Sequence, residues 1–293
     1  MLKRLFIYIK EMYPPSQAIA SLILSTCFLM CLSKLYHVSF PTTLNIYGGI
    51  VSFVWFALLL RVMDEFKDYE DDLKNYPTRP LPSGRVLKSD LKVLAGIVVA
   101  LIIGCNMMWK DQAVWAFITF GYCILMLKWF FIEKTIRKSL PLAFITHHPV
   151  AYIVLLYLAV CFQVATGLDA FTAKTLVIFP IVFGVTNWEF SRKIRGPKEE
   201  SDYVTYSMIF GAKTAVAIAL LCQLVTLVGA EIYFTCVNVP IWFRVLFGLL
   251  FLILWSPYFV FLKKMENGIK LKTWAEYIVI LTQFSIILTY FIF

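Results

Sequence analysis

Residues 64–72 read DEFKDYEDD, and residues 78–85 read TRPLPSGR. Acidic side chains crowd into the first stretch, directly after the apolar run 44–60. Asp64, Asp68 and Asp72 recur every four residues, so on a helix they lie along one slowly drifting stripe. Carboxylates stacked in this way repel one another. A hard cation such as Mg²⁺ would compensate them, because it binds one or two carboxylates together with water and phosphate oxygens.

The second stretch is basic and rich in proline. Acidic residues at the mouth of an apolar helical bundle, followed by a basic loop, predict a site for a phosphorylated lipid. An acidic run beside a membrane is more often a plain solvated loop. Only the match of both stretches to one known pattern argues against that interpretation here.

The composition is that of an integral membrane protein. Of the 293 residues, 60% are hydrophobic, and the mean hydropathy is +0.78. Soluble chains stay nearer to half apolar, and about 20 residues of helix are needed to cross a bilayer. We predict an all-α membrane protein with a single domain over residues 1–293. Nine spans are predicted, near 18–36, 44–63, 91–109, 112–130, 141–162, 173–191, 213–231, 240–262 and 274–292.

The net charge of +9 does not indicate nucleic acid, because the basic residues follow membrane topology. With nine spans, the N-terminus and the loops after spans 2, 4, 6 and 8 share one side of the membrane. That side holds 23 of the 27 Lys and Arg residues. Cytoplasmic loops carry this excess of positive charge. The split predicts a cytoplasmic N-terminus, with the acidic stretch on the cytoplasmic face.

The two stretches together resemble the first signature of the UbiA superfamily of intramembrane prenyltransferases. In this chain the signature reads Asp64-Glu65, Asp68 and Asp72, and then Arg79-Pro80-Leu81-Pro82-Ser83-Gly84. The resemblance implies nine transmembrane helices around a central cavity and a Mg²⁺-dependent reaction of an allylic prenyl diphosphate.

The resemblance also implies roles for these residues. Asp64, Asp68 and Asp72 would hold Mg²⁺, with Glu65 as a further ligand, and Arg79 would hold a diphosphate oxygen. Cleavage of the allylic carbon–oxygen bond leaves an allyl cation and diphosphate. Charge therefore develops on oxygens that metal ions and cationic side chains stabilise in the transition state.

Residues 187–211 are similar to the second, acidic signature of the superfamily, with one departure. Asn187 and Glu189 take the place of its first polar residues, where they would complete a metal shell or position the acceptor. Lys193 stands where a second carboxylate is expected. Thr205 and Gly211 keep the terminal spacing.

The departure makes the second segment basic. Arg192, Lys193 and Lys198 could bind the diphosphate in place of a second metal ion, since Arg offers a planar fork to phosphate and Lys a point charge. The alternative is an ordinary basic cytoplasmic loop. Trp188 is the aromatic residue best placed to shield the allyl cation by cation–π attraction.

The histidines near Pro149 and the seven cysteines are further candidates for functional residues. His147 and His148 precede Pro149 at the start of span 5, where a histidine could accept a proton from an acceptor; a plain interfacial histidine is the alternative. The seven cysteines form no Cys-x-x-Cys pair. We interpret them as packing residues and predict no zinc site and no required disulfide.

Three functions compete. The first is transfer of a prenyl group from a prenyl diphosphate to an unidentified small-molecule or lipid acceptor within the bilayer. The second is a terpene cyclase of the same superfamily, which would ionise the diphosphate without an acceptor. The third is a transporter, but transporters hold their ionisable site near the membrane midplane, whereas these acidic residues lie at one face. The expected location is a bacterial inner (plasma) membrane, with the active site on the cytoplasmic face.

Overall fold

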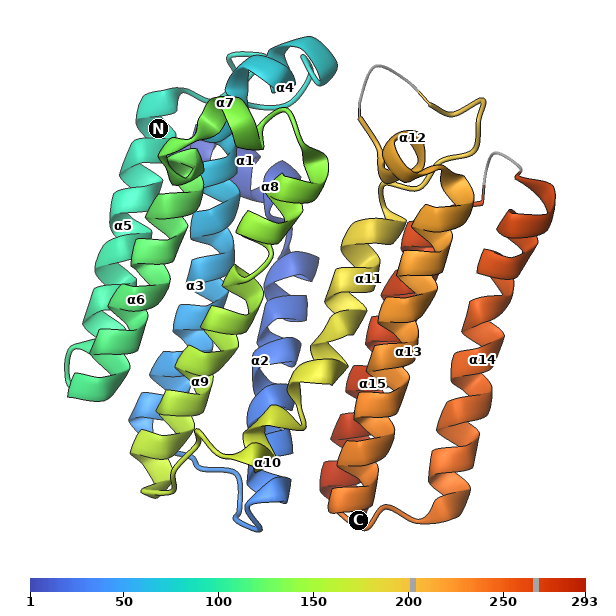
Figure 1. Ribbon diagram of the computed structural model, residues 1–293. Helices are drawn as coiled ribbons and strands as arrows, with labels where there is room; N and C mark the ends of the chain where they lie inside the picture. The colour runs from blue at the N-terminus through green and yellow to red at the C-terminus, as the bar shows by residue number, and fades with distance from the viewer. Residues whose placement is uncertain (201–203, 266–268) are drawn as a thin grey trace. The chain divides into compact units, whose positions relative to one another are not determined.

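The computed structural model describes residues 1–200, 204–265 and 269–293 (Figure 1). Every regular element in these ranges is helical. The chain divides into two compact units. Unit 1 comprises residues 1–29 and 40–170, and unit 2 comprises residues 30–39 and 171–293. A single domain over residues 1–293 remains a prediction from the sequence.

Unit 1 is built around a bundle of long helices, which pack as α3 on α5, α3 on α9 and α6 on α9. Two glycines let α3 approach its neighbours closely. A Cβ atom on Gly48 would lie 2.9 Å from the carbonyl oxygen of Cys105 in α5, and one on Gly49 would lie 2.8 Å from Sγ of Cys161 in α9. The helices of unit 1 are α1 (Leu2–Met12), the first part of α2 (Pro15–Leu35), α3 (Leu44–Lys67), α4 (Tyr69–Asn75), α5 (Lys88–Asn106), α6 (Lys110–Leu127), η1 (Trp129–Phe131), α7 (Glu133–Ile136), α8 (Leu140–His147) and α9 (Val150–Thr166).

The short helices α4 and α7 gather at the end of unit 1 where α3 finishes and α5 begins (Figure 1). The acidic stretch lies at this end. The proline-rich stretch connects α4 to α5 there.

Unit 2 is centred on α13, which packs against α11, α12, α14 and η2. Its contact with η2 depends on Gly229, because a Cβ atom there would lie 2.6 Å from Cβ of Pro180. The helices of unit 2 are the last part of α2, α10 (Ala173–Leu176), η2 (Phe179–Val182), α11 (Phe183–Ser191), α12 (Tyr206–Phe210), α13 (Ala212–Cys236), α14 (Ile241–Lys264) and α15 (Leu271–Ile292).

The predicted span near residues 173–191 is not a single continuous helix. The segment consists of α10, η2 and α11 in succession. Pro180 accounts for the break, because it has no N–H and its ring excludes the carbonyl one turn earlier in an α-helix. Hydropathy reports the apolar length of such a segment but not its interruption.

Seven helical stretches in the described part of the chain have the length and composition to cross a membrane, which supports an integral multi-pass membrane protein. They are Pro15–Leu35, Leu44–Lys67, Lys88–Asn106, Leu140–Thr166, Ala212–Cys236, Ile241–Lys264 and Leu271–Ile292. The interrupted segment 173–191 and the shorter α6 are not among them. Nine spans around a central cavity, with a cytoplasmic N-terminus, therefore remain a prediction beyond these seven.

Candidate active site

The acidic stretch continues from α3 into α4 through a bend at Asp68. Asp68 ends α3 and precedes α4 with φ −101° and ψ 12°. Its N–H donates to the carbonyl of Asp64 at 2.8 Å, and its own carbonyl accepts from the N–H of Asp72 at 2.9 Å. The helical path is thus kept across the bend, and the three aspartates follow one another at the predicted spacing.

Most carboxylates of the stretch are paired with a cation from the protein itself. Lys67 Nζ lies 2.8 Å from Oδ1 of Asp64. Arg61 pairs with Glu65, whose side chain is buried. Oε2 of Glu65 has no hydrogen-bond partner in the described part of the chain. The side chain of Glu65 thus pairs with a residue one turn earlier in the same helix.

Asp68 differs from the other aspartates of the stretch, since it forms no ion pair among the described residues. Burial raises the pKa of its carboxyl group to about 6, and Asp64, Asp72 and Asp71 add to the shift while Lys67 opposes it. The carboxylates around Asp68 thus leave negative charge that the protein only partly compensates. Oxygen donors of this kind suit Mg²⁺. Within the described residues, however, no three His, Cys, Asp or Glu side chains gather closely enough to hold a metal ion.

Arg79 connects the two halves of the signature. Its Nη1 atom donates to both carboxylate oxygens of Asp72, at 2.7 and 2.8 Å. Its guanidinium group also stacks on Tyr76, with Cζ 3.9 Å from the ring centroid. These contacts orient Arg79 beside the acidic stretch, although it comes from the loop.

The loop itself is closed by backbone hydrogen bonds. The N–H of Ser83 donates to the carbonyl of Arg79 at 3.0 Å, and the N–H of Val86 donates to that of Pro80 at 3.0 Å. Gly84 has φ +74°, a left-handed conformation that glycine adopts without a steric cost. The signature residues Pro80 and Gly84 thus shape the turn that carries Arg79.

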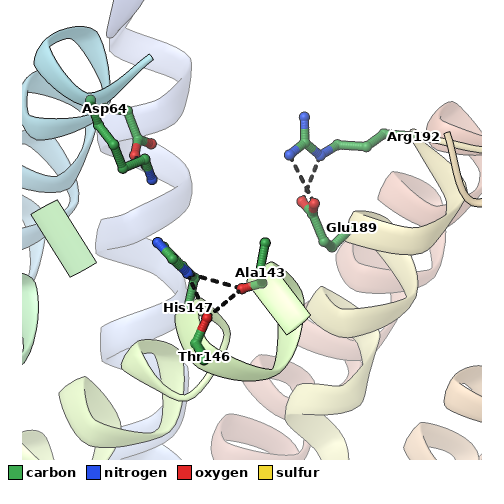
Figure 2. Close-up of polar contacts among 7 residues, drawn as sticks. Asp64, Ala143, Thr146, His147, Glu189 and Arg192 are labelled. Carbon is green, nitrogen blue, oxygen red and sulfur yellow. Dashed lines mark hydrogen bonds and ion pairs between the residues drawn. The ribbon is translucent and has the colours of Figure 1, made fainter. Parts of the chain in front are cut away.

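His147 lies in unit 1 near Lys67 and the acidic stretch. Its Nδ1 atom is 2.9 Å from the carbonyl oxygen of Ala143, and in Figure 2 its ring points toward Asp64. The ring of Trp129 lies edge-on to the imidazole at 5.2 Å and also faces Lys67 Nζ at 5.0 Å. A carbonyl can only accept a hydrogen bond, so this contact favours a proton on Nδ1. The other nitrogen, Nε2, is shielded and has no partner among the described residues.

In unit 2, Glu189 gathers the basic residues of the second segment. Arg192 donates to its two carboxylate oxygens at 2.5 and 2.9 Å (Figure 2). Lys193 Nζ lies 3.3 Å from Oε1 of the same group. One carboxylate in the last turn of α11 thus pairs with two cations that directly follow the helix.

Trp188 and Asn187 sit in different surroundings. Trp188 donates from Nε1 to Glu276 at 3.1 Å, and the Arg192 guanidinium lies over its ring at 5.4 Å. Asn187 is fully buried, and its Oδ1 accepts from Ser191 at 3.0 Å and from Gln223 at 3.1 Å. Trp188 therefore lies beside Arg192, whereas Asn187 links α11 to α13 by a hydrogen bond.

The rest of the second segment is anchored by Thr205. Its hydroxyl accepts from the N–H of Met208 at 3.2 Å, which caps α12, and donates to Glu200 at 2.8 Å. Residues 201–203 of this segment lie outside the described residues. Gly211 has φ +77°, and it precedes α13 directly. Lys198 lies between Arg192 and Thr205, in the connection from α11 to α12.

Sequence reasoning missed the residues that hold these groups in place. The pairs Asp64–Lys67 and Arg61–Glu65 have the three- and four-residue spacing of neighbours on a helix, so the sequence did carry a signal for them. The pair between Asp71 and Arg137, at 2.8 Å, joins segments far apart in the chain. No spacing in the sequence could have predicted it.

No protein-family model and no curated protein sequence matches the chain. A solved structure of a digeranylgeranylglyceryl phosphate synthase matches it with a TM-score of 0.67 and 16% sequence identity. The match covers 98% of this chain and 99% of the synthase chain. The chain therefore has the fold of a UbiA-family membrane prenyltransferase, in agreement with the resemblance carried by its signature residues.

Proposed function

We propose that this protein transfers an isoprenyl group from an allylic prenyl diphosphate to an acceptor within the membrane, with the help of Mg²⁺. The contact between Asp72 and Arg79 carries the proposal, because it unites the acidic and the proline-rich halves of the signature in one site. The shared fold with a solved prenyl-transferring synthase supports it.

The proposal assigns roles to this chain's own residues. Arg79, held by Asp72 and stacked on Tyr76, would bind a diphosphate oxygen from a fixed direction. Asp64, Asp68 and Asp72 would hold Mg²⁺, which would neutralise charge on the departing diphosphate. Glu65 is a less suitable ligand than the sequence predicted, because it is buried and paired with Arg61.

The second segment would supply further cations. Arg192, Lys193 and Lys198 would bind the diphosphate, and Trp188 would shield the allyl cation. Glu189 would hold Arg192 and Lys193 in position rather than act as a metal ligand, since its oxygens already accept from both. Asn187 would serve the site by fixing the last turn of α11.

The test is turnover by the purified protein in liposomes. It is incubated with a series of labelled allylic prenyl diphosphates, with and without Mg²⁺, and with several acceptor classes. A glyceryl phosphate lipid is the first acceptor to test, because the name of the solved synthase describes such a product. We expect diphosphate release that requires both Mg²⁺ and an acceptor.

Two results would contradict the proposal. Absence of diphosphate release with every donor and acceptor would remove the enzymatic function. Formation of a cyclic product from the prenyl diphosphate alone would support the terpene cyclase, which no observation in the structure favours. The excess of basic residues on one side supports a proposed site on the cytoplasmic side of the membrane.

A further inference from the structure

The N-terminal helix α1 contacts the same end of unit 1 as the signature loop. Arg4, Tyr8 and Glu11 are spaced by four and three residues, so they lie on one face of the helix. Leu2 and Phe6, by contrast, are 78% and 69% exposed. The first face therefore turns toward the protein.

Each residue of the inward face has a defined environment. Arg4 donates to both carboxylate oxygens of Asp90, at 2.6 and 2.9 Å, and thereby fastens α1 to the start of α5. Tyr8 is fully buried. Glu11 accepts from Nη1 and Nη2 of Arg85, at 2.5 and 2.8 Å. The helix is thus fastened at two points by ion pairs, with a buried ring between them.

Arg85 belongs to the signature loop and holds it closed. Its Nη2 atom also donates to the carbonyl of Thr78 at 2.7 Å, and its Nε atom donates to Oγ of Ser83 at 3.1 Å. These two acceptors flank the turn that begins at Arg79. A single guanidinium group thus connects both ends of the loop to Glu11.

Because the oxygens of Glu11 bind Nη1 and Nη2 together, they fix the plane of the guanidinium group. The orientation of that plane determines how the guanidinium N–H groups point toward Thr78 and Ser83 of the loop. We propose that Glu11 is a positioning residue for the diphosphate site: through Arg85 it fixes the loop that presents Arg79 to the substrate. The inference rests on the proposed function for its kinetic consequence, but not for its structural one.

The kinetic test compares Glu11→Gln with Arg4→Gln. The two variants each remove one bidentate ion pair from the same helix, but only Glu11 contacts the signature loop. The Glu11–Arg85 pair is exposed, so its effect is modest. We expect Glu11→Gln to raise KM for the prenyl diphosphate about two- to fivefold with little change in kcat, and Arg4→Gln to leave KM unchanged.

A double-mutant cycle with Arg85→Gln tests the route. If Glu11 acts through Arg85, the double variant should have the same KM as Arg85→Gln alone, because the pair is already broken. Additive effects of the two substitutions would overturn the proposal. So would an equal rise in KM for Glu11→Gln and Arg4→Gln, which would indicate that α1 is only a structural support.

A second measurement does not depend on turnover. Hydrogen exchange at the amides of Ser83, Gly84 and Val86, which are hydrogen-bonded within the loop, reports its closure directly. We expect faster exchange in Glu11→Gln and unchanged exchange in Arg4→Gln. Unchanged exchange in Glu11→Gln would overturn the proposal. If the wild-type protein shows no prenyl transfer, the proposed function fails, and this measurement still decides the role of Glu11.

Discussion

Arg79 binds both carboxylate oxygens of Asp72 through a single nitrogen, Nη1. The remaining N–H groups of its guanidinium are therefore left to other partners. The Tyr76 ring beneath the group, 3.9 Å from Cζ, restricts how far it can turn. This arrangement is suited to an anion that arrives beside Asp72, and it distinguishes Arg79 from an ordinary surface arginine.

Arg79→Lys should raise KM for the prenyl diphosphate about tenfold, although the positive charge is kept. Lysine lacks both the planar fork and the flat face that stacks on Tyr76. Steady-state kinetics with a labelled diphosphate would measure this. Arg137→Lys is the matched control, because Arg137 also pairs with an aspartate of α4 but lies outside the proposed site. Equal effects of the two substitutions would remove the special role of Arg79.

Asp68→Asn should abolish the Mg²⁺-dependent turnover, with a loss of at least about a hundredfold in kcat/KM. Asp68 is partly buried and forms no ion pair among the described residues, so its carboxylate is available to a metal ion. Removal of Mg²⁺ with a chelator should have the same effect on the wild-type protein and should be reversed by added Mg²⁺.

Glu70→Gln serves as the control for Asp68→Asn. Glu70 lies two residues further along, in α4, and is exposed. The substitution removes one acidic charge from the same stretch, so it reports any general electrostatic effect. If both variants lose activity to the same extent, Asp68 has no specific role as a ligand.

Arg192→Ala and Lys193→Ala should each weaken binding of the prenyl diphosphate, by about three- to tenfold in KM. Both residues are held by Glu189, so their charges lie close together just beyond the end of α11. Lys263→Ala, at the end of α14, removes one positive charge from the same unit and controls for net charge. An unchanged KM in the first two variants would show that Arg192 and Lys193 do not bind the diphosphate and belong to an ordinary basic cytoplasmic loop.

The signature residues were accessible from sequence because they follow one another along the chain. Asp64, Asp68, Asp72 and Arg79 lie within one helix end and one loop, so their spacing implies their proximity. Glu11 and Arg85 are separated by 74 residues and meet only because α1 folds back onto the loop. No local pattern records such a contact.

The fold was predictable for a related reason. Long apolar runs must become helices in a bilayer, because no water is available there to satisfy the backbone. Breaks within these runs depend on tertiary packing as well. The helix is interrupted at Pro180, whose ring packs closely against Gly229 of α13. Hydropathy carries no information about such a contact.

Gly229→Ala should therefore destabilise the protein by about 1–3 kcal/mol. The added Cβ atom would lie 2.6 Å from Cβ of Pro180 and 3.0 Å from the backbone nitrogen of Ile181, and neither can move without shifting η2. Gly248→Ala in α14 is the control, because nothing lies within 4 Å of its added Cβ atom. Thermal unfolding in detergent would measure both, and a neutral Gly229→Ala would contradict the close packing.

Phe131→Gly should be more stable than Phe131→Ala. Trp129, Phe130 and Phe131 are consecutive residues with positive φ, of +48°, +51° and +61°. For residues with a Cβ atom this conformation costs roughly 1–2 kcal/mol each, and glycine avoids that cost. Both substitutions remove the same exposed ring, which is 76% accessible, so their difference isolates the backbone. We expect Phe131→Gly to unfold at a temperature several degrees above that of Phe131→Ala. Equal unfolding temperatures would show that the turn is not strained at this residue.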